Sequence, residues 1–155
     1  MRKTLFIAVG WVLLIQPSFA QSFNDYIELT REVLKTEKKA AVAQAMQLND
    51  AESGPFWDLY NEYNAELYKV HTDRVNLIKE FAASYENLSD EKADELWSGS
   101  MDYQNRLLKL KKRYYKKFRK ILSAVKASRY FQIENKIDAL VSAELALEIP
   151  LIETK

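Results

Sequence analysis

The sequence contains no cysteine, which excludes disulfide bonds, thiol redox chemistry and cysteine metal ligands. It has only three glycines and three prolines, and one of each lies within the first twenty residues. Only Gly54, Gly99, Pro55 and Pro150 remain to interrupt regular structure after residue 20. So few helix breakers favour long helices, and no glycine-rich loop is present to hold a phosphate group.

Histidine is also scarce, since His71 is the only one in 155 residues. A nucleophilic triad needs a histidine beside an activated serine, and His71 falls inside a predicted long helix. Its helical neighbours supply no second metal ligand, so we expect a surface or boundary residue. We therefore predict no enzyme, no catalytic residue, no metal site and no cofactor.

Residues 1–20 have the three parts of a secretory signal peptide in the required order. Arg2 and Lys3 give a positive start, residues 5–15 form an apolar run, and Ala20 ends a small-residue cleavage site. A run of this length rises about 16 Å as a helix, against about 30 Å for the core of a bilayer. We therefore expect cleavage near Ala20/Gln21, a periplasmic or secreted protein, and no transmembrane anchor.

Cleavage would leave a nearly neutral chain, residues 21–155. The predicted signal peptide holds two of the 23 basic residues and none of the 22 acidic ones, so the remainder carries a formal charge of −1. This balance and the predicted export argue against a nucleic-acid partner. The length suits one domain with a hydrophobic core.

The remaining chain predicts an all-α fold of four helices. The first is expected over residues 23–48, capped by Ser22, with one apolar face: Phe23, Ile27, Leu34 and Ala41. The polar stretch 49–54 predicts a turn, and Pro55 is suited to the first position of a second helix that runs to about Asn87. Apolar residues at spacings of three and four continue through this second helix.

The third helix is predicted to start after the cap Ser89, and the fourth after the cap Ser123, with Pro150 ending the fourth. The junction at Leu88–Ser89 is so short that helices two and three must form an antiparallel hairpin. Each helix spans roughly 50 Å, so two shorter helices cover this elongated hairpin poorly. Excess apolar surface favours self-association, and we expect a homodimer.

Charge is concentrated on the third helix, because no acidic residue occurs from Tyr103 to Ile133. The bases of its polar face form a candidate anion- or client-binding surface: Arg106, Lys109, Lys112, Arg113, Lys116, Lys117 and Lys120. One alternative is a solvated face paired with Asp58, Glu62 and Glu66 of the second helix. Another is a surface for acidic client segments or acidic lipid head groups, the latter as a peripheral membrane contact. Lys111 points toward the apolar side, so its stem is expected to pack there, and its amine either snorkels to solvent or meets an acid of a neighbouring helix.

The two predicted helix starts share the pattern L-S-x-x-K-A, beginning at Leu88 and at Leu122. These starts resemble the L-T-x-x-Q motif of the CpxP–Spy family of small secreted helical proteins. Serine keeps the cap, but Lys92 and Lys126 stand where the family has glutamine, and lysine has no acceptor for the return hydrogen bond. The resemblance implies a four-helix protein, often a curved dimer, that handles unfolded envelope proteins or reports envelope stress; related members sense metals.

Together these features predict a non-enzymatic envelope-stress or chaperone-like binding protein. It would use an apolar-aromatic helical face with a basic rim, and its partners would be unfolded or acidic envelope proteins. Two alternatives stay open: a structural or regulatory adaptor for one envelope partner, and a metal-responsive periplasmic sensor.

Overall fold

The computed structural model describes residue 32 and residues 34–154. The chain divides into two compact units, Met1–Lys39 and Ala40–Lys155, and the fold below is that of the second unit. The predicted signal peptide and the predicted cap at Ser22 lie outside the described residues. None of the helices in the described part is long and apolar enough to cross a membrane.

Residues 34–46 are helical, so the first predicted helix ends two residues early. Gln47 has a φ of 47°, in the left-handed region that commonly ends helices. The buried side chains of its last turns are Val42 and Met46, whereas Ala41 is exposed. Ala41, which was expected on the apolar face of this helix, therefore lies outside its buried side, which Val42 and Met46 form at a spacing of four.

The second helix, α2 (Asp50–Ser84), begins five residues before the predicted position. Asn49 is its cap, because the Glu52 amide donates to Asn49 Oδ1 at 2.9 Å and the Asn49 amide donates to Glu52 Oε2 at 3.1 Å. This reciprocal capping box turns the predicted polar loop into helix. The prediction that Pro55 opens the helix was wrong, and Pro55 lies within it.

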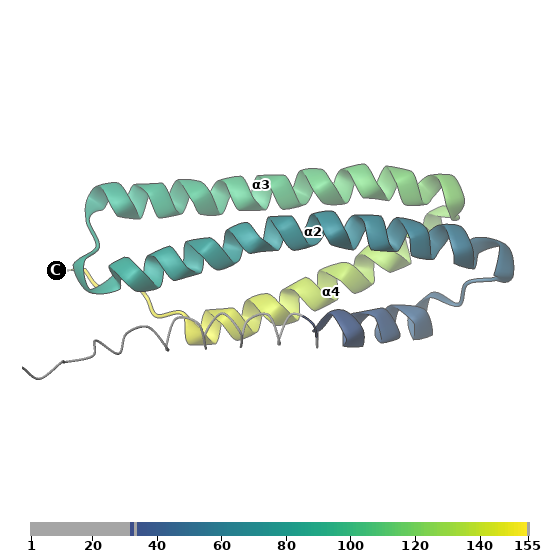
Figure 1. Ribbon diagram of the computed structural model, residues 1–155, viewed down its shortest axis with the longest axis horizontal. Coiled ribbons are helices and arrows are strands. Elements are labelled where there is room, and N and C mark those ends of the chain that lie inside the picture. Colours follow the sequence, from purple (N-terminus) through teal and green to yellow (C-terminus); the bar gives the residue numbers. More distant parts are fainter. Residues whose placement is uncertain (1–31, 33, 155) are drawn as a thin grey trace, which may run out of the picture. The chain divides into compact units, whose positions relative to one another are not determined.

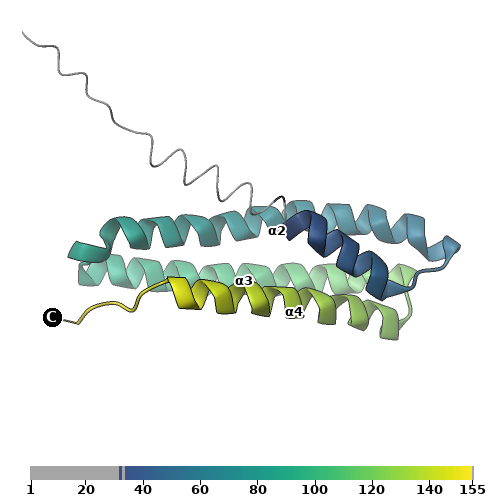
Figure 2. The ribbon, with the colours of Figure 1, turned by 90° about the horizontal axis from the view of Figure 1, so that it is seen from below.

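The other predicted helices are confirmed. After α2 come a short 3₁₀ turn, η1 (Tyr85–Asn87), then α3 (Asp90–Ile121) and α4 (Ala124–Glu148). The described residues contain no strand, so the all-α prediction holds. Figures 1 and 2 show α2 and α3 side by side in opposite directions, with α4 beside them. The ion pairs between these helices described below give the same antiparallel register.

The fully buried core occupies one half of the hairpin. Rings from three helices meet there, with centroids of Phe118 and Tyr130 4.6 Å apart and those of Phe56 and Phe118 5.4 Å apart. No described residue of α2 after Val70, or of α3 before Tyr103, is buried to the same degree. Apolar side chains nearer the hairpin turn are therefore only partly covered.

Candidate functional site

Three of the seven predicted basic residues pair with acids of α2. Arg106 Nη1 lies 2.5 Å from Asp73 Oδ2, and Lys117 Nζ lies 2.5 Å from Glu62 Oε1. Arg113 pairs with Glu66. The predicted pairing with Glu62 and Glu66 is therefore confirmed for this part of the face. The hydrogen bond from Lys117 is the main cause that lowers the pKa of Glu62, followed by one from the Tyr114 hydroxyl.

The other four predicted bases form what we call the lysine stripe: Lys109, Lys112, Lys116 and Lys120. They follow at spacings of three and four, so they share one side of α3, and all four side chains are exposed. Within residues 34–154, no carboxylate lies within ion-pairing distance of any of them. The structure thus separates a paired flank of the basic face from an open stripe.

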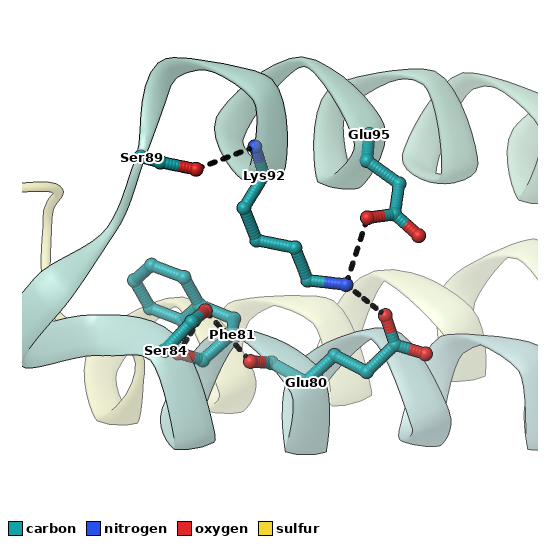
Figure 3. Close-up of polar contacts among 6 residues, drawn as sticks. All are labelled: Glu80, Phe81, Ser84, Ser89, Lys92 and Glu95. Carbon is teal, nitrogen blue, oxygen red and sulfur yellow. Dashed lines mark hydrogen bonds and ion pairs between the residues drawn. The ribbon is translucent and has the colours of Figure 1, made fainter.

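The L-S-x-x-K pattern has one structural role at both of its positions. Ser89 Oγ accepts from the Lys92 amide and Ser123 Oγ from the Lys126 amide, each at 3.2 Å, which confirms both caps. Lys92 Nζ donates to Glu80 of α2 at 2.7 Å and to Glu95 at 3.0 Å (Figure 3).

Lys126 pairs in the same way with Glu52 of α2, at the other end of the hairpin. The hydrogen bond from Lys126 is the main cause that lowers the pKa of Glu52, and the bond to Glu80 raises the pKa of Lys92. Each lysine in the glutamine position of the resembling motif therefore ties a helix start to α2. The two lysine–glutamate contacts join residues that are 12 and 74 positions apart in the sequence, so the motif alone could not predict them.

A polar cluster lies between α2, α3 and α4. Lys111 pairs with Asp138 of α4 and donates to Asn135 Oδ1 at 3.0 Å, which confirms the predicted acid partner of Lys111. His71 Nε2 lies 3.8 Å from Asp138 Oδ1, and His71 Nδ1 lies 3.2 Å from the Tyr103 hydroxyl. With 30% of its side chain exposed, His71 is a boundary residue, as expected.

Glu134 was not singled out from the sequence, yet it is almost fully buried on α4. It lies among tyrosines, and its charge adds to the effect of burial in raising the pKa of Tyr60, Tyr63 and Tyr130. Tyr130 lies four residues before Glu134 on α4, but Tyr60 and Tyr63 come from α2, so the sequence near Glu134 shows only part of this cluster.

A groove of about 530 Å³ lies in the half of the second unit nearer the hairpin turn. Leu77, Ile78 and Phe81 of α2 line it, with Leu96, Trp97 and Leu107 of α3. Ile149 and Ile152, at and after the end of α4, complete its apolar wall. The chain after α4 is held there by the Tyr85 hydroxyl, which donates to the carbonyl oxygen of Leu151 at 3.1 Å.

The groove offers apolar contact at its surface. Trp97 is 67% exposed and Ile152 is 53% exposed. Arg74 and Asp138 contribute charged groups to its lining. The lysine stripe begins beyond Leu107 along α3 and does not line the groove. Among the described residues that line the groove, Arg74 is the only basic one, so most of the predicted basic rim is not found there.

No group of three or more His, Asp or Glu side chains in residues 34–154 is arranged to hold a metal ion.

Comparisons of the chain with protein-family models, with curated proteins and with solved structures found no match.

Proposed function

We propose that this chain is a non-enzymatic, extracytoplasmic chaperone-like protein that holds apolar segments of unfolded clients in the groove near the hairpin turn. The groove is the single observation that carries the proposal. Its apolar lining includes a tryptophan that is 67% exposed, and a concave surface lined mainly by apolar side chains with a few polar groups is typical of binding sites. Tryptophan is also enriched among residues that dominate binding energy.

The extracytoplasmic location rests on the predicted signal peptide, and client handling is also what the resemblance to the CpxP–Spy family implies.

The predicted homodimer belongs to the same proposal. Leu140 and Leu147 of α4 are 72% and 82% exposed and lie seven residues apart, so they share a helix face that a second copy could cover. Sedimentation of the chain that begins at Gln21 gives the particle mass, and a monomer at all concentrations would remove the dimer from the proposal.

The test is suppression of aggregation. A client protein is diluted from denaturant into buffer with stoichiometric amounts of the chain that begins at Gln21, without ATP, and light scattering is recorded. We expect the wild-type chain to reduce scattering. Trp97→Ser/Ile152→Ser removes two exposed apolar side chains of the groove and should weaken suppression about tenfold or more.

Leu108→Ser/Val125→Ser is the matched control, because it removes two apolar side chains that are 51% and 78% exposed but do not line the groove. This control should suppress aggregation as the wild type does. Equal activity of the two double variants would show that the groove is not the binding surface.

A further inference from the structure

The lysine stripe lies on the side of α3 that faces away from the core. Successive helical residues turn by about 100°, which places Lys109, Lys112, Lys116 and Lys120 in one sector opposite the buried Tyr114 and Phe118. From the first lysine to the last, the stripe extends about 16 Å along the helix. Neither α2 nor α4 crosses this side of α3 (Figures 1 and 2).

Compensation of the helix dipole does not account for the stripe. A basic side chain gains from the dipole only in the last turn of a helix, which in α3 contains Arg119 and Lys120. Lys109, Lys112 and Lys116 lie before that turn. Ion pairing does not account for them either, since the paired bases Arg106, Arg113 and Lys117 carry out that role toward α2.

Charge on the outer side of α3 changes sign along its length. Its first half carries exposed acids, among them Glu91, Asp94 and Asp102, and its second half carries the stripe. The total charge is close to zero, so the attraction for an anionic partner is local and orients the molecule. The basic half would face the partner and the acidic half would be turned away.

The form of the stripe decides which partner fits best. A stable protein interface buries about 800 Å² on each side around an apolar centre, whereas the stripe consists of four lysines, none of which lines the groove near the hairpin turn. Lysine is a flexible point charge, in contrast to the arginine fork that selects one bidentate partner. A fluid lipid surface provides phosphates at any spacing and so matches a straight row of mobile ammonium groups.

We infer that the lysine stripe is a peripheral docking surface for anionic phospholipid head groups. This inference does not depend on client binding in the groove. The chain that begins at Gln21 is mixed with vesicles of phosphatidylglycerol and phosphatidylcholine, or of phosphatidylcholine alone, and bound protein is measured by sedimentation. Binding is expected only with phosphatidylglycerol, and it should weaken between 0.01 M and 0.5 M salt as the Debye length falls from about 30 Å to a few ångströms.

The decisive comparison uses two variants with the same loss of charge. Lys109→Gln/Lys116→Gln removes half of the stripe and should lower binding about fivefold per lysine. Lys69→Gln/Lys136→Gln removes two exposed lysines elsewhere and should bind within about twofold of the wild type, since screening confines the attraction to nearby charges.

Three results would overturn the inference. One is equal binding to both kinds of vesicle, and another is an equal loss of binding in both variants. The third is saturable binding of soluble poly-glutamate through the stripe in the absence of vesicle binding, which would assign the stripe to an acidic protein instead. Suppression of client aggregation is read separately, so it can persist or fail without deciding the vesicle result.

Discussion

Replacing Gly99 with alanine adds a methyl group at the point where α3 passes Leu77 of α2. A Cβ atom at position 99 would lie 2.6 Å from Leu77 Cδ2, which is too close, so the Leu77 side chain must turn. A shift away from a favoured rotamer costs about 0.5–1.5 kcal/mol. Alanine in place of glycine within a helix stabilises it by about 1 kcal/mol. The two effects nearly cancel, so we expect the free energy of unfolding to change by less than about 0.5 kcal/mol.

The clash can be separated from helix propensity by repeating the change in a Leu77→Ala background. There the added methyl group meets no side-chain end, and Gly99→Ala should stabilise by the full amount of about 1 kcal/mol. The measurement is urea unfolding of the four proteins followed by circular dichroism, which gives the coupling energy between the two positions. A stabilisation of about 1 kcal/mol in both backgrounds would refute the close approach of α2 and α3 at Leu77.

Three further predictions concern the polar contacts. Lys126→Met removes the hydrogen bond that lowers the pKa of Glu52; the loss in thermal stability should be largest above pH 4.5, the ordinary value for this carboxyl, and should fade as the pH falls below it. Burial raises the pKa of Tyr130 above its ordinary value of 10.0, so stability should decline as the pH rises past 10.0, and the loss of helical circular dichroism should coincide with a further rise in tyrosinate absorbance beyond that of the exposed tyrosines. Lys111→Met retains the packed stem but removes the ammonium group, so the free energy of unfolding should fall by about 1–2 kcal/mol in urea titrations, and this loss should be smaller in an Asp138→Asn background.

Local signals predicted much of the fold. Ser89 and Ser123 cap α3 and α4 as expected, because capping depends on residues within one turn of the helix start. The short junction at Leu88–Ser89 predicted the antiparallel hairpin, and that hairpin places Glu62 and Glu66 beside Lys117 and Arg113. The predicted start of α2 at Pro55 was wrong because the capping box of Asn49 and Glu52 sets where the helix begins.

The candidate sites depended on contacts that the sequence does not display. The groove requires Ile149 and Ile152 to lie against α2 and α3, and that position depends on a hydrogen bond between residues 66 positions apart. Glu134 acts on Tyr130, four residues earlier on its own helix, and on Tyr63 of α2, and only the first of these follows from local spacing. The lysine stripe was part of a predicted basic face, but only the ion pairs with α2 show which of its members remain open.

The central claim, that apolar client segments bind in the groove near the hairpin turn, is tested most directly by the fluorescence of Trp97. In the chain that begins at Gln21, Trp57→Phe leaves Trp97 as the only tryptophan. Because Trp97 is 67% exposed, its emission should lie at long wavelength in the free protein. Titration with a short apolar peptide that lacks tryptophan should shift the emission to shorter wavelength and saturate. An emission that stays unchanged while the same protein still suppresses aggregation would place client binding elsewhere and contradict the proposal.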